Sequence, residues 1–543
     1  MGGNLPVDLD NNNYYVNAPG TNNFVGFYTT NRKTLADWQA ATGKEAKSFA
    51  ANPAFLDPSN ENYSPGNAAL DNKGIYVGID VDINNAPRNT TTPDIGAYEF
   101  TPPPCSTPPV TGPTTLSIAR ICENNPVFLT LNIGAYGSAQ TFQWQFSTTS
   151  GGTYSSLGNP MLTPDTTILA SQTYYYRAAV TCGSTTVYTT PVLLTVDPVL
   201  PSGTYTINKN AGATYVPGTP GGNFISFAAA KAAMSCGIGG AVVFNVVSGS
   251  GPYNEKLVLD SIPGASAINT ITFNGNGNTI TGNSTASNDR AIIKLNGADH
   301  IIFDSLVVDA GTGTFGYGIQ LINNADSNII RKCSVLSRNT GTTNYAGIVI
   351  NASDASAIAT GNTFCDGNLI DSNSINGGYY GITLVGGTTA ATYIANNKIT
   401  NNKIYDFYST GLQITGTGNT LIAKNTFARP TITTTASIVY GIYITTAPST
   451  ALQISKNRFT GFYDANTSGA ATTYAVYHNS VDATAGGENT VSNNLIYSIG
   501  GNGQTYGLYN NGSDNVRYYH NTISLDNTAS TAAGQTIGFY QNT

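Results

Sequence analysis

A short apolar phrase built on Gly-Ile recurs through the C-terminal half of the chain. Its first full copy is Tyr317-Gly-Ile-Gln-Leu, and the Gly (or Ala) position returns at intervals of 29 to 34 residues. The later copies lie at 346–350, 380–384, 410–414, 440–444, 474–476, 506–508 and 537–539. A period in this range is the signature of stacked structural repeats. Each repeat is too short to bury its own apolar face, so it must pack against its neighbours.

A second landmark, Asn-x-Ile or a close variant, accompanies the phrase. The asparagines are Asn373, Asn402, Asn425, Asn457, Asn494 and Asn521, and alignment places Asp304 and Cys333 in the same slot of earlier repeats. In most repeats the two landmarks are too close for a strand–helix–strand unit. Short β-branched runs between Asn/Gly turns instead predict two or three strands per repeat. Helix-free parallel coils form a β-helix, which we expect over 203–543.

Two ladders of side chains should run along this coil. Asparagine suits a turn, because it tolerates left-handed backbone and its amide can bond the next asparagine of the stack. The tyrosines before the Gly predict a second, interrupted ladder, formed by Tyr317, Tyr380, Tyr440, Tyr474 and Tyr506. Stacked aromatic rings stabilise one another, so wall packing is the first explanation of this ladder and a sugar-stacking platform is the second.

A helix is predicted just before the repeats, over about 223–236. Asn223 is a suitable N-cap and Gly237 a suitable stop, and Phe224, Phe227 and Met234 fall on one face. An open β-helix end exposes unpaired strand edges. We therefore expect the helix to act as a lid on the first coil.

Segment 113–197 has a different pattern. Alternating strands surround Cys122, Trp144 and Cys182, and this Cys…Trp…Cys arrangement is typical of an immunoglobulin-like sandwich. One departure is Val180, which stands where a tyrosine-corner Tyr is expected. The fold signal predicts a disulfide between Cys122 and Cys182. The proline-rich stretch 101–112 in front of it indicates a semi-rigid linker.

The first hundred residues contain no full repeat. Thr34-Leu-Ala-Asp37 predicts a capping box at the start of a short helix that runs toward Gly43.

Composition separates the chain from typical cytosolic enzymes, because only 10% of its residues are charged and the net charge is −7. This balance also argues against nucleic-acid binding, and favours an extracellular setting. No apolar run reaches the length of a membrane span, and the N-terminus has no signal-peptide pattern.

Several phrases resemble secreted bacterial repeat proteins. The stretch 94–99 (Asp-Ile-Gly-Ala-Tyr-Glu), with 38–43 and 53–57 upstream, resembles the C-terminal end of right-handed parallel β-helix domains. Segment 113–197, with its Phe-Gln-Trp-Gln and Tyr-Tyr-Arg-Ala phrases, resembles immunoglobulin-like modules of very large surface proteins of Bacteroidota. Segment 203–543 resembles the earlier coils of such a β-helix. The resemblance implies export by type IX secretion and a role as a surface adhesin, fibre or motility-related filament.

The expected architecture is therefore all-β. It comprises the C-terminal end of one β-helix (1–100), the linker, an immunoglobulin-like sandwich (113–197) and a right-handed parallel β-helix (203–543). Either the chain is a window of a giant tandem array, or residues 1–100 complete the open end of another copy and build a filament. Continuous arrays favour the window.

No catalytic residue is predicted. A glycan-cleaving β-helix would need paired acids, whereas the acids here stand alone: Asp304, Asp309, Asp326, Asp354, Asp366 and Asp371. The three histidines, His300, His478 and His520, have no metal-ligand spacing. Neither zinc nor thioredoxin-like chemistry has support, because no CxxC pair occurs.

Calcium is the one cofactor considered. Asp8, Asp10, Asp80 and Asp82 lie in two oxygen-rich stretches, but neither fits the twelve-residue calcium loop. Asx-rich turns are the alternative explanation, and Arg88 is expected to pair with Asp94 to hold the closing loop.

The function predicted from the sequence is non-enzymatic, extracellular, structural and adhesive. The alternatives are a glycan-binding or glycan-cleaving β-helix and a head-to-tail filament subunit. Expected partners are further modules or copies of the same protein and surface glycans, not nucleic acid. The sequence does not identify the ligand, the oligomeric state or the pairing of Cys105, Cys236, Cys333 and Cys365.

Overall fold

A computed structural model describes residues 7–16, 23–133, 135–311, 313–434, 436–445, 447–527 and 535–542. The chain divides into two compact units, Met1–Pro198 and Val199–Thr543. Each unit is described by itself.

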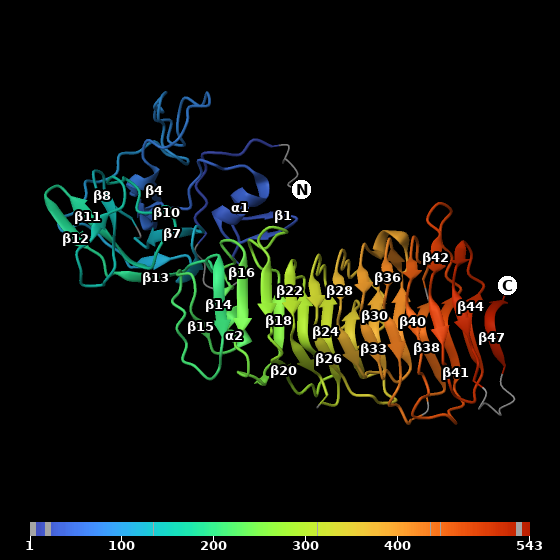
Figure 1. The fold of residues 1–543 in the computed structure, drawn as a ribbon. Helices are drawn as coiled ribbons and strands as arrows, with labels where there is room; N and C mark the ends of the chain where they lie inside the picture. Colours follow the sequence, from blue (N-terminus) through green and yellow to red (C-terminus); the bar gives the residue numbers. More distant parts are fainter. Residues whose placement is uncertain are drawn as a thin grey trace. The chain divides into compact units, whose positions relative to one another are not determined.

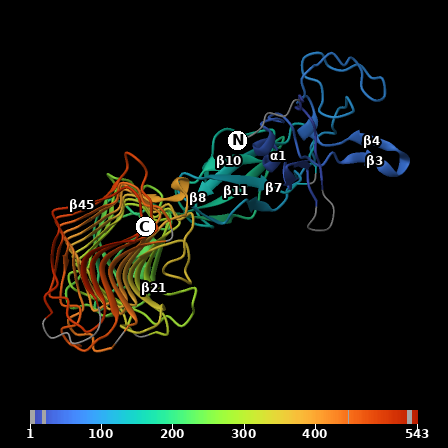
Figure 2. The ribbon, with the colours of Figure 1, turned by 90° about the vertical axis from the view of Figure 1, so that its right-hand side faces the viewer.

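The C-terminal unit is a parallel coil with three walls (Figure 1). Figure 2 looks along the coil and shows the strands of successive turns stacked on one another. The pairings between neighbouring wall strands are parallel, for example between β24 (Gly316–Ile322) and β27 (Tyr345–Ile350). The predicted β-helix is thus confirmed.

The bounds of the strands show how regularly the coil is built. Wall 1 consists, in spatial order, of β15 (Asn223–Phe224), β14 (Gly203–Ile207), β16 (Val242–Val246), β19 (Ile271–Asn274), β22 (Ile301–Asp304), β25 (Ile329–Arg331), β28 (Leu369–Asp371), β32 (Lys398–Thr400), β36 (Leu421–Ala423), β39 (Gln453–Ser455), β42 (Asn489–Ser492) and β45 (Val516–Tyr519). Wall 2 consists of β17 (Tyr253–Asn254), β20 (Thr279–Thr281), β23 (Val307–Asp309), β26 (Ser334–Leu336), β29 (Ser374–Asn376), β33 (Lys403–Tyr405), β37 (Thr426–Ala428), β40 (Arg458–Phe459), β43 (Leu495–Tyr497) and β46 (Thr522–Ser524). Wall 3 consists of β18 (Leu257–Asp260), β21 (Ala291–Asn296), β24, β27, β30 (Tyr380–Val385), β34 (Thr410–Thr415), β38 (Ile438–Thr445), β41 (Thr472–Asn479), β44 (Thr505–Asn511) and β47 (Thr536–Asn542). Three short elements lie outside the three walls. They are the paired strands β31 (Ile394–Ala395) and β35 (Thr417–Gly418) and the 3-10 turn η3 (Ala390–Thr392).

The recurrent isoleucines form one column inside wall 3. Ile319, Ile348 and Ile382 are register partners in successive turns, and the column continues through Leu412 to Ile442. All of these side chains are fully buried. A second internal column begins with phenylalanines, because Phe244, Phe273 and Phe303 stack at centroid distances of 4.9 and 5.4 Å.

The glycine of the phrase is explained by close approach between turns. A Cβ at Gly381 would lie 2.6 Å from the backbone oxygen of Gly411 and 2.6 Å from a methyl group of Ile404. The phrase therefore combines an isoleucine that fills the interior with a glycine that lets the next turn approach.

The short helix predicted near the start of the coil is present, between β15 and β16, but with different bounds. Helix α2 spans Phe227–Ala233, and its N-cap is Ser226, whose hydroxyl accepts a hydrogen bond from the backbone N–H of Ala229. Asn223, the predicted N-cap, instead belongs to β15 and donates its amide to the backbone oxygen of Asn208. Phe227 and Met234 enter the core of the coil. The helix thus covers apolar side chains of the first turns.

The N-terminal unit contains two facing sheets. The smaller has the order β10 (Thr166–Leu169), β7 (Pro126–Leu131), β5 (Thr114–Leu116). The larger has the order β6 (Arg120–Cys122), β13 (Val192–Asp197), β11 (Tyr174–Cys182), β8 (Thr141–Ser147), β9 (Ser155–Ser156), with β12 (Thr185–Tyr188) paired to β11. Trp144 is completely buried between them and donates its indole N–H to the backbone oxygen of Pro164 at 2.8 Å. A sandwich is therefore present, while its immunoglobulin-like kinship stays a prediction.

The described part of the first hundred residues forms short elements rather than stacked coils. They are β1 (Gly26–Tyr28), β2 (Thr30–Arg32), α1 (Leu35–Thr42), β3 (Phe55–Asp57), η1 (Pro58–Asn60), β4 (Asn62–Pro65) and η2 (Ala68–Leu70). Helix α1 starts at the predicted capping box of Thr34 and Asp37. Ala69 lies in the core of the sandwich, and the N–H of Ala68 donates to the backbone oxygen of Tyr136. That this segment is the end of another β-helix stays a prediction.

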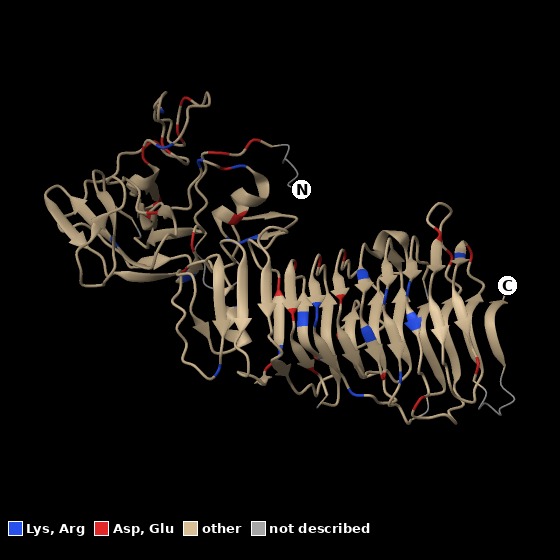
Figure 3. Cartoon of the chain, in the orientation of Figure 1, with Lys and Arg blue, Asp and Glu red and all other residues tan. Residues whose placement is uncertain are grey.

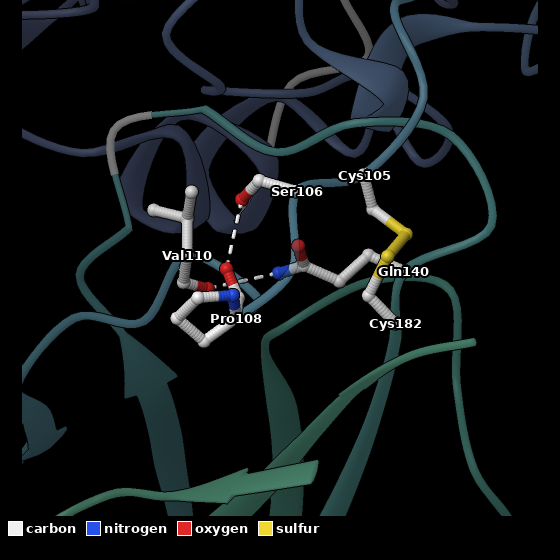
Figure 4. The surroundings of a disulfide bond; sticks show 6 residues. All are labelled: Cys105, Ser106, Pro108, Val110, Gln140 and Cys182. Carbon is white, nitrogen blue, oxygen red and sulfur yellow. Dashed lines mark hydrogen bonds between the residues drawn. A yellow bond between two sulfur atoms is a disulfide. The ribbon is translucent and has the colours of Figure 1, made fainter. Parts of the chain in front are cut away.

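The proline-rich stretch 101–112 is held against the sandwich and is not a free linker. Cys105 forms a disulfide with Cys182 (Figure 4). The backbone N–H of Cys105 donates to the backbone oxygen of Ser138. Gln140 donates its amide to the backbone oxygen of Val110 at 2.9 Å. These bonds hold the stretch against the sandwich at Cys105 and at Val110.

The predicted disulfide between Cys122 and Cys182 is wrong, because Cys182 is joined to Cys105. Strand register gives the reason. Cys122 is the register partner of Asp197 at one end of the larger sheet, while β11 reaches Cys182 only at its opposite end. Eight residues of strand from Tyr174 to Cys182 span about 26 Å, which is far beyond the reach of a disulfide.

Candidate functional site

Six asparagines form a continuous hydrogen-bonded ladder between walls 1 and 2. They are the residues that the sequence predicts to stack: Asn373, Asn402, Asn425, Asn457, Asn494 and Asn521. Each amide donates to the side-chain oxygen of the next at 2.9–3.1 Å. Cys333 stands in the preceding slot and its N–H donates to Asn373 at 2.9 Å. The slot before that belongs to Leu306, not to Asp304, which lies on the outer face of wall 1.

The residue before each ladder position has left-handed backbone and lies at the surface. These residues have φ between 51° and 58° and are Ser305, Lys332, Ser372, Asn401, Lys424, Lys456, Asn493 and His520. The turn is therefore fixed by the buried asparagine, whereas the residue in front of it is free to vary in chemistry. Any ligand of this edge would meet the variable residue.

A second, shorter ladder lies at the start of the wall 1 strands and was not predicted. Asn328 donates its amide to Asn368 at 3.1 Å, and Asn368 donates to Asn397 at 3.2 Å. Each stands five residues before a position of the first ladder slot, in the same Asn-x-Ile pattern. A search for two such patterns per repeat could have found it.

The tyrosines form two columns on the outer face of wall 3. Tyr440, Tyr474 and Tyr506 are register partners and stack at 5.3 and 5.0 Å, while Ala346 and Thr410 interrupt the column toward Tyr380 and Tyr317. A second column, which was not predicted, contains Tyr443, Tyr477, Tyr509 and Tyr540.

Ring orientation decides what these columns can do. The interplanar angles of the first column are 13° and 9°, so the rings use their faces against one another. Burial raises the pKa of Tyr440 and of Tyr474 well above the usual phenol value. A sugar ring needs an open aromatic face, so this geometry favours wall packing over a sugar-stacking platform.

The predicted acids of the coil are engaged by neighbours. Arg331 lies between Asp304 and Asp371 in register and donates to Asp304 at 2.6 Å. Burial alone would raise the pKa of Asp304, but hydrogen bonds from Ser305 and Arg331 hold it below the usual value. Hydrogen bonds from Thr400, Asn401 and Ser372 similarly outweigh burial and lower the pKa of Asp371.

The other four acids also have structural partners. Asp326 and Asp366 accept backbone N–H bonds from the next turn at 2.7 Å. Asp354 pairs with Lys294 at 2.7 Å, and Asp309 accepts the N–H of Gly311. Burial raises the pKa of Asp326. None of these contacts forms the acid–water–acid arrangement that an inverting glycosidase requires.

The histidines are separated by the fold. His300 and His520 occupy left-handed turns. His478 is completely buried inside wall 3, where it is the register partner of Ile444 in the column next to the isoleucine column, and its Nδ1 lies 3.2 Å from the hydroxyl of Tyr518. Burial lowers the pKa of His478 to about 4.

Three of the four calcium candidates serve as hydrogen-bond acceptors. Asp82 accepts the backbone N–H groups of Asn84, Ala86 and Glu99. Asp10 accepts from the N–H of Lys47, and Asp80 accepts from the hydroxyl of Tyr76. Asp8 lies exposed. The described residues include no group of three or more His, Cys, Asp or Glu side chains that could hold a metal ion.

The predicted pairing of Arg88 with Asp94 is wrong in detail. Arg88 pairs with Glu99 at 3.5 Å and donates to the backbone oxygen of Asp94. The Asp94 carboxylate instead accepts the N–H groups of Asn72 and Phe100, and burial raises its pKa to about 6. Hydrogen bonds between backbone groups and the side chains of Arg88 and Asp94 therefore hold the closing loop.

Two hollows lie on the outer face of wall 1. One, of about 620 Å³, lies over β25 to β39 and includes Leu369, Lys398, Asn419 and Gln453. The other, of about 290 Å³, lies over β39 to β45 and also includes Gln453. Their linings are mostly amide, hydroxyl and aliphatic, with Lys398 in the larger hollow and the ion pair of Glu488 with Arg517 in the smaller one, and they contain no aromatic ring. The two hollows share Gln453 and therefore adjoin along the coil, and we call them together the groove of wall 1.

Comparison with known proteins gives similarity of fold. The family described as "Right handed beta helix region" matches residues 363–527. No curated protein matches the chain. In the described part of the chain, no helix is long and apolar enough to cross a membrane.

Several solved structures are similar to this chain at low identity. PfbA, a surface adhesin of Streptococcus pneumoniae, is 14% identical with a TM-score of 0.35, over 63% of this chain and 93% of that one. The Dettilon tailspike protein is 12% identical with a TM-score of 0.30, over 57% and 64%. A family 28 exopolygalacturonase of Yersinia enterocolitica is 11% identical with a TM-score of 0.22, over 79% and 98%. The fold itself is established by the walls described above, and the chain is an all-β protein built around a right-handed parallel β-helix.

Proposed function

We propose that this chain is a non-enzymatic structural and adhesive protein of the cell surface. The observation that carries the proposal is the unbroken asparagine ladder, which ties six successive turns together beside a continuous apolar core. Turns that are cross-linked in this way form a stiff support for an outward-facing surface. Twelve strands in wall 1 correspond to a length of about 53 Å.

The state of the acids supports a binding role over a cleaving one. Catalytic acids need a free face and a partner at a suitable distance. In the described coil Asp304 and Asp371 are held by Arg331 and by turn hydroxyls, and Asp326 and Asp366 bind backbone of the next turn. The contacts of these four carboxylates therefore stabilise the coil.

The test measures attachment and cleavage with the same preparation of the full chain. Beads coated with the chain are expected to attach to glycan-bearing surfaces, and soluble glycans incubated with it should gain no new reducing ends. Release of new reducing ends that is lost in Asp304→Asn or Asp371→Asn would show that the coil is an enzyme. Adhesion would be contradicted if beads coated with the chain attach no more often than beads coated with an unrelated β-protein.

A further inference from the structure

One edge of the coil carries a dense group of cations on an otherwise acidic protein. Between residues 396 and 460 the sequence holds six Lys or Arg residues and one acidic residue, Asp406. Five of the six cations are exposed, and we call them the basic edge: Lys398, Lys403, Lys424, Lys456 and Arg458. Figure 3 shows this blue group on the middle turns, around β33 and β40.

Strand register places the basic edge on three successive turns. Lys403, Thr426 and Arg458 are consecutive register partners in wall 2. Lys424 and Lys456 occupy the variable left-handed position in front of the asparagine ladder on adjacent turns. Since turns are about 4.8 Å apart, the five cations lie within about 10 Å along the axis.

Among the described residues these cations have no ion-pair partner. The seven ion pairs of the described residues include none of the five. Asp406 is buried and accepts from the N–H and the hydroxyl of Thr431. Asp371, on the preceding turn of wall 1, is occupied by Thr400 and Asn401. Clustered like charges repel one another, so the basic edge lowers its free energy when an anion binds.

The groove of wall 1 indicates which kind of anion fits. Lys398 belongs both to the basic edge and to the larger hollow. The groove extends over seven strands, from β25 to β45, which corresponds to about 29 Å. Its amides and hydroxyls can bond to sugar hydroxyls, and the exposed lysines can pair with carboxylate or sulfate groups.

Nucleic acid fits this surface less well. Single strands are bound through aromatic side chains on which bases stack, and the groove has none. We propose that the basic edge and the adjoining groove bind an acidic polysaccharide that carries carboxylate or sulfate groups. This inference rests on the proposed adhesive function and names the class of ligand.

The experiment measures the affinity of the full chain for four probes: polygalacturonate, heparin, neutral dextran and single-stranded DNA. The test variant is Lys424→Gln/Lys456→Gln/Arg458→Gln. The matched control, Lys33→Gln/Lys44→Gln/Lys47→Gln, removes the same charge from the N-terminal unit. We expect the unchanged chain to bind at least one acidic polysaccharide, with weaker binding at higher salt. The test variant should lose about tenfold in affinity and the control should lose nothing.

A charge-preserving variant separates binding from folding. Lys424→Arg/Lys456→Arg should retain the affinity, since it keeps both charges at the same positions. The proposal is overturned if neither acidic polysaccharide binds, if dextran binds equally well, if the control loses as much as the test variant, or if DNA binds more tightly than both glycans. Cleavage of a bound glycan would contradict the non-enzymatic role while leaving the binding site intact, so the two failures are distinguishable.

Discussion

Asn402 and Asn425 are joined by two hydrogen bonds to a single oxygen. The amide of Asn402 donates to the side-chain oxygen of Asn425 at 3.0 Å, and the backbone N–H of Asn402 donates to the same oxygen at 2.9 Å. The Asn425 amide in turn donates to the backbone oxygen of Ile399 at 2.8 Å. One buried side chain thus satisfies three polar groups of the preceding turn of the coil, in β32 and in the bend after it, which explains why the same residue type recurs at this position.

Asn425→Ala should therefore destabilise the coil strongly. It leaves two donors of Asn402 and one acceptor of Ile399 buried without partners, and the expected loss is about 3 kcal/mol in the free energy of unfolding. Urea unfolding followed by circular dichroism measures the loss. Asn376→Ala, on the half-exposed outer face of wall 2, is the control and should cost less than about 0.5 kcal/mol. Equal losses in the two variants would contradict the importance of the ladder.

The local residue pattern predicted the coil well, because every repeat needs the same residue types at the same positions. The asparagine slot and the isoleucine column were found because identical residues recur at one period. The N-cap of α2 was misplaced because Asn223 and Ser226 are both good caps, and only packing chooses between them. The disulfide was missed because spacing along the chain says nothing about the register of β6 beside β13.

The basic edge was not predicted from the sequence, for a related reason. Lys424 and Lys456 are far apart in sequence from each other and from Lys398, and overall composition shows a net negative charge. Only after the turns are stacked do these residues share an edge. Charge clusters in a coil depend on register across turns, which a residue count over the whole chain averages away.

The Cys105–Cys182 bond should be detected directly by peptide mapping without reduction. One linked peptide pair should contain Cys105 and Cys182 and disappear on reduction. Because the bond closes a loop of 77 residues, Cys182→Ser should cost the N-terminal unit about 4 kcal/mol. Cys365→Ser replaces a buried free thiol and leaves the covalent loop intact. Linkage of Cys122 to Cys182 in the map would overturn the assignment.

Gly381→Ala should destabilise the coil through steric overlap with the next turn. The added methyl group would lie 2.6 Å from the backbone oxygen of Gly411, which cannot move without disturbing the wall. We expect a loss of about 2 kcal/mol in thermal or urea unfolding. Gly538 holds the same position in the last copy of the phrase, and its Cβ would meet nothing within 4 Å. Gly538→Ala should therefore be nearly neutral, and a loss equal to that of Gly381→Ala would argue against the overlap.

His478 should make the stability of the coil depend on pH. Burial lowers the pKa of its imidazole from 6.5 to about 4, so the folded state holds the neutral ring while the unfolded state binds a proton below pH 6.5. Stability is then fully present above about pH 6.5 and is lost as the pH falls toward 4, by about 3 kcal/mol.

His478→Ile restores the side chain found at Ile444 one turn earlier and should remove this dependence, although it also deprives the Tyr518 hydroxyl of its partner. Hydrogen exchange of the β41 and β44 amides between pH 7 and pH 4.5 measures the effect, with His300→Asn in a half-exposed turn as the control. An unchanged pH slope in His478→Ile, or its loss in His300→Asn, would show that the buried ring is not the titrating group.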